Sequence, residues 1–290
     1  MRVICPNPKD ISNNVLEFLR KNFKCYFKKI SQKEFDKIAN NFDIIISRFN
    51  HKINYKQNSK IKYILSPTTG IDHIDEKFFK KKTKIYCLKN QFKFLDKINA
   101  SSEYSIYLIL KSLKKFDLNK KNHSREINNQ NIGIIGYGRI GKKVAKVITS
   151  MGANVKIFDK NSKKIPTFKR SSLNDILRKS NLISLHIPLD KKNKHFLNNE
   201  KIKKLKKNCI IINTSRGDIV EEKFIYKKIL KKKIIYITDV IGNFLKGKLK
   251  HLSKYKKNFL YTKHVAGLTR ESIQKTDNFI LKKFLNDINL

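Results

Sequence analysis

The chain has 290 residues, 40% of them hydrophobic, and a mean hydropathy of −0.51. This length predicts one large or two ordinary domains, with a core that needs neither disulfides nor a structural metal. No apolar run approaches the roughly 18 residues of a membrane span, and the opening segment is too short to be a secretory signal. The sequence therefore excludes an integral membrane protein and predicts a soluble one.

The formal net charge of +43 raises the question of nucleic-acid binding. Lysine provides 57 of the 66 basic residues and arginine only 9, although arginine makes the better bidentate contacts with phosphates and bases. Lysine, isoleucine and asparagine together make up 128 residues, which is typical of an AT-rich coding sequence. We therefore favour mutational bias, and expect a solvated positive surface that binds no specific nucleic acid and no membrane.

The four cysteines lie far apart in the sequence, at Cys5, Cys25, Cys87 and Cys209. They include no closely spaced pair of the kind found in zinc sites, and their pattern does not resemble a disulfide framework. We therefore expect reduced thiols, no metal site and a cytoplasmic location.

Short apolar runs that predict strands alternate with amphipathic stretches over roughly the first 90 residues. The predicted strands are Arg2–Cys5, Cys25–Phe27, Asp43–Ser47, Ile61–Leu65 and Lys84–Cys87. Helical patterns fall between several of them, for example at Asn13–Lys21 and Asp75–Lys81. This alternation predicts parallel strands that are joined by right-handed crossovers.

A long apolar stretch, Ser101–Phe116, predicts a helix that begins after Asn99. Glu103 lies in its first turn, where the helix dipole favours a carboxylate. The apolar surface of this helix must be buried, and we expect a homodimer interface, although the surface could equally be buried within one chain. The polar residues Asn119–Asn131 predict a loop.

The alternation resumes at Ile132 and becomes stronger. The predicted strands are Ile132–Ile135, Asn154–Phe158, Leu182–His186, Cys209–Asn213, Ile234–Asp239 and Phe259–Thr262. Six such strands predict a doubly wound parallel sheet. The last stretch, 270–290, carries its apolar residues on one helical face, so we expect it to pack back on the first domain. The chain is thus divided into residues 1–99, completed by 270–290, and residues 100–269.

The segment Asn131–Gly141 contains a GxGxxG motif formed by Gly136, Gly138 and Gly141. A strand pattern precedes the motif and a helical pattern follows it, which is the context for dinucleotide binding. There, Gly136 permits a tight turn, Gly138 lets a pyrophosphate approach the backbone, and Gly141 lets the helix pack close to the strand. The alternative is that the glycines only mark turns, and the complete context favours a bound dinucleotide.

Asp159 ends the next strand pattern, eighteen positions after Gly141. A carboxylate there accepts hydrogen bonds from the adenosine ribose and repels a 2′-phosphate, which predicts NAD as the cofactor. The alternative is that Asp159 only caps a helix. The choice of NAD over NADP stays open, because Lys160, Lys163 and Lys164 lie nearby and could neutralise a phosphate.

Three further segments resemble the D-isomer-specific 2-hydroxyacid dehydrogenases. They are Ser184–Leu189 (SLHIPL), Ile211–Val220 (IINTSRGDIV) and His264–Ser272 (HVAGLTRES), with weaker matches at Gly70–Asp75 and Glu103. The resemblance covers nearly the whole chain, and the motifs in this order are far more specific than any one alone. It implies an α/β fold, with an NAD-binding Rossmann domain and a smaller flavodoxin-like substrate domain.

Arg216 and His264 are the expected catalytic pair. Arg216 follows a predicted strand and offers a guanidinium fork for a carboxylate. His264 follows another strand and titrates near neutral pH, so it can exchange a proton with a hydroxyl or carbonyl oxygen. The alternative is a surface arginine and a loop histidine with ordinary hydrogen bonds. Within the matching motifs we expect an NAD-dependent oxidoreductase that interconverts a small D-2-hydroxy acid and its 2-keto acid.

The resemblance also implies which residues line the cofactor and the substrate. The cofactor residues are Gly136, Gly138, Arg139, Ile140, Gly141, Asp159, His186, Pro188, Thr214, Ser215, Asp239 and Gly267. The substrate residues are Thr69, Gly70 and Arg48. The amides of Thr68–Gly70 are expected to contact the carboxylate, and Arg48 is expected at the far end of the substrate. Asp239 is expected on the nicotinamide carboxamide, and His186 is expected to be structural.

The sequence departs from the family pattern beside the catalytic histidine. Relatives usually carry a glutamate about five residues after the aspartate that Asp239 matches, where it orients the histidine and raises its pKa. Asn243 or Phe244 stands at that place here. Asn243 could act as a neutral partner, Glu271 or another acid could replace the glutamate, or turnover could be lost. We favour an altered enzyme, and the alternative is a non-catalytic NAD-binding regulatory protein.

Overall fold

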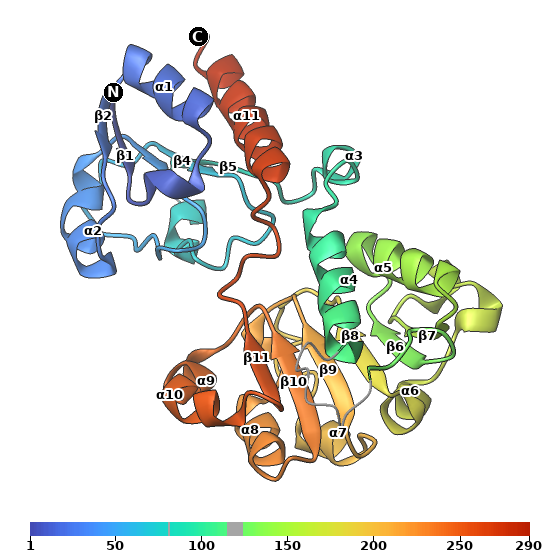
Figure 1. Cartoon of the computed structure of the whole chain (residues 1–290). Coiled ribbons are helices and arrows are strands. Elements are labelled where there is room, and N and C mark those ends of the chain that lie inside the picture. The colour runs from blue at the N-terminus through green and yellow to red at the C-terminus, as the bar shows by residue number, and fades with distance from the viewer. Residues whose placement is uncertain (81, 115–123) are drawn as a thin grey trace. The chain divides into compact units, whose positions relative to one another are not determined.

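The computed structural model describes residues 1–80, 82–114 and 124–290, which form two compact units. The N-terminal unit contains Met1–Ile98 and Leu268–Leu290, and the central unit contains Asn99–Gly267. Each unit is built on a parallel sheet, as Figure 1 shows. The alternation of strands and helices in the sequence therefore forms an α/β unit in both halves of the chain.

The N-terminal unit has a five-stranded sheet in the order β2-β1-β3-β4-β5. Its strands are β1 (Arg2–Cys5), β2 (Lys24–Phe27), β3 (Ile44–Ile46), β4 (Tyr63–Ser66) and β5 (Lys84–Cys87). Its first helices are α1 (Asn13–Asn22), α2 (Gln32–Ile38) and α3 (Phe92–Leu95). Every strand pair is parallel, because helical crossovers return the chain to the same end of the sheet.

The last helix, α11 (Arg270–Asp287), completes the core of this N-terminal unit. Ile280 and Phe284 are 1% and 0% exposed and pack with the apolar residues of β1 and α1. The Phe284 ring lies edge-on to Tyr63 of β4 and Tyr86 of β5, at centroid distances of 5.2 and 5.7 Å. Residues from the two ends of the chain thus share one hydrophobic core.

Arg48, which the sequence analysis expects at the far end of the substrate, also belongs to this core. The side chain is buried and forms an ion pair of 2.6 Å with Asp277 of α11. Its other N–H groups donate to the carbonyls of Asp10 and Pro67 and to the Thr276 hydroxyl. These internal partners occupy the guanidinium, so Arg48 joins α11 to the N-terminal sheet.

The central unit has a six-stranded parallel sheet in the order β11-β10-β9-β8-β6-β7. The strands are β6 (Asn131–Ile135), β7 (Asn154–Phe158), β8 (Leu182–Leu185), β9 (Cys209–Asn213), β10 (Ile234–Thr238) and β11 (Phe259–Tyr261). The helices are α4 (Ala100–Leu113), α5 (Arg139–Ser150), α6 (Leu173–Lys179), α7 (Asn199–Lys203), α8 (Glu222–Leu230), α9 (Asn243–Lys246) and α10 (Leu249–Leu252). The predicted doubly wound sheet is confirmed.

Alternate residues of the central strands pack in two hydrophobic cores, one on each face of the sheet. Ile211 of β9 packs in the cluster that includes residues of α6, α7 and α8, whereas its neighbours Ile210 and Ile212 pack with α4 and α5. The strands are therefore apolar on both faces, as expected for a sheet covered by helices on each side.

Some predicted elements differ in length or type. The stretch predicted as a helix at Asp75–Lys81 is a 3₁₀ segment, Glu76–Lys80, and residue 81 lies outside the described residues. Helix α4 ends at Leu113, and residues 115–123 of the predicted helix and loop are likewise not described. Leu108 and Ile109 of α4 are buried against the central sheet, which gives this helix a buried face within its own unit.

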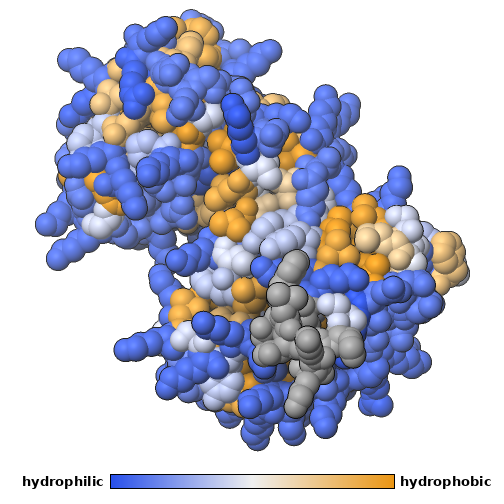
Figure 2. All heavy atoms as spheres, in the orientation of Figure 1, coloured by the Kyte–Doolittle hydropathy of each residue, from blue (hydrophilic) through white to orange (hydrophobic). Residues whose placement is uncertain are grey.

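The surface of the molecule is mostly hydrophilic in the view of Figure 2. An apolar area lies over α5, where Val147 and Met151 are 39% and 40% exposed. In the described part of the chain, no helix combines the length and the apolar character needed to cross a bilayer.

Replacing Arg48 with methionine should lower the free energy of unfolding by about 3–5 kcal/mol, because it leaves the Asp277 carboxylate buried without its counter-charge. Urea unfolding followed by far-UV circular dichroism measures the change. Lys179→Met is the matched control, since Lys179 forms an exposed pair with Asp175 and should cost at most about 0.5 kcal/mol. Equal midpoints for the two variants would contradict the structural assignment of Arg48.

Candidate functional site

The glycine loop joins β6 to α5 and leaves room for a ligand at one glycine only. Gly136 has a φ of +97°, and a Cβ there would lie 2.5 Å from the carbonyl oxygen of His186. A Cβ on Gly141 would lie 2.0 Å from the carbonyl oxygen of Gly136. A Cβ on Gly138 would meet nothing within 4 Å. The first and third glycines thus serve the fold, and Gly138 faces open space.

That open space lies at the N-terminus of α5, where the helix dipole and free N–H groups favour an anion. Gly138 is the N-cap, and Arg139 and Ile140 are the first helical residues. The loop therefore fits the pyrophosphate of a dinucleotide, with these three residues as its expected contacts.

Asp159 follows β7 and fixes the glycine loop. One carboxylate oxygen accepts a hydrogen bond of 2.6 Å from the Tyr137 amide, and the other accepts one of 2.8 Å from the Asn161 amide. A carboxylate has about four acceptor positions, so two remain for the hydroxyls of an adenosine ribose. Asp159 can therefore bind the ribose, as predicted, and at the same time hold the Tyr137 amide of the glycine loop.

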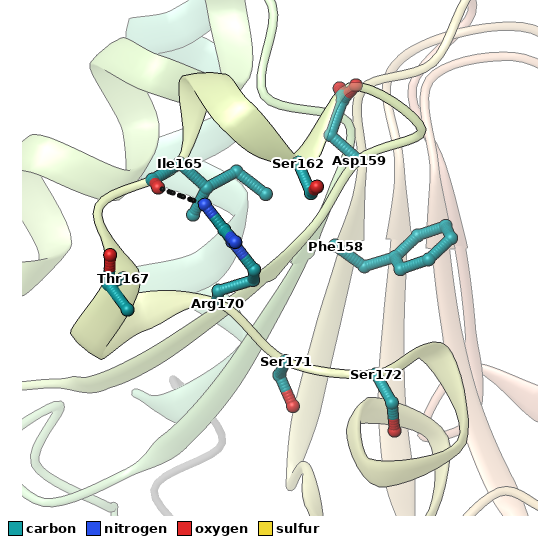
Figure 3. Close-up of a pocket in the computed structure, with 8 residues that line it drawn as sticks. All are labelled: Phe158, Asp159, Ser162, Ile165, Thr167, Arg170, Ser171 and Ser172. Atoms are coloured by element: carbon teal, nitrogen blue, oxygen red, sulfur yellow. Dashed lines mark hydrogen bonds between the residues drawn. The ribbon is translucent and has the colours of Figure 1, made fainter.

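A cavity of about 450 Å³ opens beside Asp159 at the end of β7. Figure 3 shows its lining residues, which are Phe158, Asp159, Ser162, Ile165, Thr167, Arg170, Ser171 and Ser172. The Arg170 guanidinium donates a hydrogen bond of 3.4 Å to the carbonyl oxygen of Ile165. The Asp159 carboxylate points away from the Arg170 guanidinium. The sequence analysis missed Arg170, because it lies in a polar stretch without any periodic pattern.

His186 follows β8 and supports the glycine loop through its backbone. Its carbonyl oxygen lies against Gly136, and its ring hydrogen-bonds the Ser184 hydroxyl at 2.9 Å. Burial lowers the pKa of His186 to about 4, so the ring is neutral at physiological pH. These contacts agree with the structural function expected for His186, and Pro188 lies two residues further along the same loop.

The loop after β9 carries Thr214, Ser215 and Arg216. The Ser215 hydroxyl donates to the Leu185 carbonyl oxygen at 2.6 Å, and the Thr214 hydroxyl lies 2.9 Å from that of Ser105. Arg216 donates through Nη1 to the carbonyl oxygen of Ser215. The INTSRG segment is therefore anchored on β8 and α4, and places the guanidinium at the carboxyl edge of the sheet.

His264 lies in a turn after β11, at the same edge as Arg216. Asp239 follows β10, the strand between β9 and β11. Neighbouring strands are about 4.8 Å apart, so two spacings place the strand ends that lead to Arg216 and His264 about 10 Å apart. The parallel sheet brings these residues to one edge, although 48 positions separate them in the sequence.

Gly267 is the last residue of the central unit, and a Cβ on it would lie 3.7 Å from the Ser101 hydroxyl. The predicted substrate residues Thr69 and Gly70 lie in the N-terminal unit. There the Thr68 hydroxyl donates to the Gly70 carbonyl oxygen at 2.7 Å, and it contacts the Ser66 hydroxyl at 2.8 Å. These bonds fix the loop that carries the expected carboxylate contacts.

The segment that lacks the family glutamate is held by a different carboxylate. Buried Glu222 of α8 accepts hydrogen bonds from the amides of Gly242 and Leu245, at 2.5 and 2.9 Å, and burial raises its pKa. The Phe244 ring packs edge-on against Tyr226, at a centroid distance of 5.7 Å, and Asn243 is exposed. Sequence analysis missed Glu222, because an acid at the start of a helix is ordinarily a surface residue.

Gly138→Ala should leave the fold intact and weaken NADH binding about tenfold or more, because the added methyl group meets no protein atom but occupies the space for the pyrophosphate. Fluorescence titration with NADH and a thermal melt measure the two effects. Gly141→Ala is the contrasting variant and should lose both stability and binding, since its Cβ overlaps the Gly136 carbonyl. Unchanged NADH affinity in Gly138→Ala would contradict the assigned phosphate site.

The neutral, partly buried His186 should make the protein less stable as the pH falls. Its folded-state pKa of about 4 lies below the ordinary 6.5, so between these values the unfolded chain binds a proton that the folded chain does not. The stabilisation is complete above about pH 6.5 and falls by up to about 3 kcal/mol toward pH 4. Urea midpoints of wild type and His186→Gln should diverge across this range, whereas exposed His251→Gln should follow wild type.

Comparison with known proteins supports the family resemblance. Residues 105–266, more than half of the chain, match the model of the D-isomer specific 2-hydroxyacid dehydrogenase NAD-binding domain. An erythronate-4-phosphate dehydrogenase of Wigglesworthia glossinidia brevipalpis is 36% identical over 210 residues, which are 69% of this chain and 51% of the relative. The chain thus spans about half the length of that relative. A hydroxypyruvate reductase of Thermotoga maritima is 24% identical, with coverage of 100% and 99%.

The fold resembles those of solved D-lactate dehydrogenases. The Escherichia coli apo-structure has a TM-score of 0.80 at 20% identity, and covers 100% of this chain and 97% of that one. The Aquifex aeolicus structure, complexed with NAD and lactic acid, has a TM-score of 0.77 at 22% identity, with coverage of 100% and 96%. The predicted fold is confirmed, and the matching family model, that of an NAD-binding domain, confirms the predicted cofactor, NAD. The chain is a member of the D-isomer specific 2-hydroxyacid dehydrogenase family.

Proposed function

We propose that the chain is an NAD-dependent oxidoreductase that interconverts a small D-2-hydroxy acid and its 2-keto acid. The observation that carries the proposal is the placement of Arg216 and His264 at one edge of the NAD-binding sheet, on either side of β10. Ligands bind at this edge in open parallel sheets. One guanidinium and one imidazole are the groups needed to hold a carboxylate and to move a proton.

In the reducing direction, bound NADH supplies the hydride that C2 of the keto acid receives. Arg216 binds the carboxylate and polarises the neighbouring carbonyl. Protonated His264 gives its proton to the carbonyl oxygen as C2 is reduced, and the product is the 2-hydroxy acid. In the oxidising direction, neutral His264 takes the hydroxyl proton.

The substrate we propose first is a 2-hydroxy acid with a phosphate group. Four of the similar proteins are named erythronate-4-phosphate dehydrogenase, and they are 30–36% identical over 56–78% of this chain. The highly positive chain also attracts a doubly charged ester more strongly than a simple acid. Hydroxypyruvate and glyoxylate, which other relatives are named for, are the next candidates.

Three further predictions belong to this proposal. The domains are residues 1–99 with 270–290, and residues 100–269. The protein is a homodimer, for which the exposed Tyr107 of α4 supplies part of an apolar surface. It acts in the cytoplasm. Sedimentation of the purified protein tests the oligomeric state directly.

The second candidate function is an NAD-binding protein without turnover, which the missing glutamate favours. Absorbance at 340 nm, which follows NADH, distinguishes an oxidoreductase from an NAD-binding protein without turnover. The oxidation assay contains 4-phosphoerythronate and NAD. The reduction assays contain NADH with hydroxypyruvate, glyoxylate or pyruvate. Arg216→Ala should lower kcat/KM by about 10²–10³-fold, and His264→Gln should lower kcat at least 10²-fold, with NADH affinity kept in both. NADH binding without turnover of any acid in this panel would instead establish the second candidate.

A further inference from the structure

His264 lies in a backbone turn of unusual conformation. Lys263 and His264 have φ values of +49° and +60°, which place two consecutive residues with side chains in the left-handed region. A residue other than glycine adopts this region only when its surroundings determine it. Some other part of the protein must therefore hold the turn, and with it the position of the His264 ring.

The fully buried Asp239 makes the required contacts. One carboxylate oxygen accepts hydrogen bonds from the Thr262 hydroxyl, at 2.7 Å, and from the Val265 amide, at 2.9 Å. The other accepts one of 2.8 Å from the Ala266 amide. The Asp239 carbonyl oxygen accepts a fourth, of 2.7 Å, from the amide of His264 itself. One residue thus binds donors from both sides of the histidine.

These contacts differ from the role expected for Asp239, a hydrogen bond to the nicotinamide carboxamide. Both carboxylate oxygens are directed to the turn, and the residue has no solvent-exposed surface. Hydrogen bonds to a charged acceptor are about twice as strong as neutral ones, and inside the protein this difference is larger. The carboxylate is therefore suited to stabilise a strained turn.

We infer that Asp239 and Thr262 are positioning residues, which orient the catalytic His264 through its backbone. The family resemblance implies a glutamate that orients this histidine from the ring side, and this chain has Asn243 or Phe244 at that place. The Asp239–Thr262 contact fixes the direction in which the His264 side chain leaves the turn. The inference rests on the proposed function for its catalytic part, and on the hydrogen bonds alone for its structural part.

Thr262→Val tests the inference, because it removes the hydroxyl donor and keeps the shape of the side chain. We expect kcat to fall about tenfold, with KM and Kd for NADH unchanged within about twofold. Thr262→Ser restores the donor and should restore kcat to within about twofold. Thr149→Val, which removes a threonine hydroxyl from the far end of α5 in the same unit, is the matched control and should behave as wild type.

Asp239→Asn tests the carboxylate itself. An amide has one acceptor oxygen, so its NH₂ group must face either the Ala266 amide or the donors at Thr262 and Val265. We expect kcat to fall about 10²-fold with NADH affinity kept. Weaker NADH binding with unchanged kcat would overturn the inference and assign Asp239 to the nicotinamide. Equal kcat in Thr262→Val and wild type would overturn the contribution of Thr262.

Hydrogen exchange measured by mass spectrometry separates failure of this inference from failure of the proposed function. Peptides that contain residues 262–266 should exchange faster in Thr262→Val and Asp239→Asn than in wild type and Thr149→Val, with or without turnover. If the two variants exchange faster and the wild-type protein has no activity, the proposed turn contacts stand and the proposed oxidoreductase function is rejected. If exchange in the two variants is unchanged and the wild-type protein is active, the proposed turn contacts are rejected and the proposed oxidoreductase function stands.

Discussion

The parallel register of the central sheet is the constraint on which the site depends. Every strand of this sheet runs in the same direction, so the chain leaves each strand at the same edge. The expected site residues all follow strand ends; they are the glycine loop, Asp159, His186, Arg216, Asp239 and His264. No local interaction between Arg216 and His264 is needed to bring them to this edge, because the ladder of β9, β10 and β11 sets their spacing.

Carboxylates that are buried or half-buried hold the loops at this edge in place. Asp159 binds the Tyr137 amide, Glu222 binds the turn before α9, and Asp239 binds the turn of His264. The chain has 23 acidic and 66 basic residues. These three carboxylates nevertheless accept hydrogen bonds from backbone amides and, within the part of the chain that the structure describes, form no ion pair with a lysine. A carboxylate that satisfies two or three backbone donors fixes a loop more specifically than an exposed ion pair.

Much of the fold could be predicted from sequence, because strand and helix patterns are local. The eleven strands found in residues 1–80, 82–114 and 124–290 lie within two residues of their predicted positions at both ends. The glycine motif also identified the cofactor loop. The structural contacts of Arg48, Glu222 and Asp239 could not be predicted in this way. Each depends on partners far away in the sequence, as with Arg48 and Asp277, and residue type alone does not distinguish a buried ion from an exposed one.

The position of α11 has a consequence for synthesis of the protein on the ribosome. The N-terminal sheet emerges before the central unit, but Phe284 and Ile280, which complete its core, emerge almost 190 residues after Ile98. At about 5–20 residues per second, this delay is on the order of 10–40 s. The central unit is contiguous in the sequence and can fold during that interval. The N-terminal unit therefore completes its core only after the central unit has been translated.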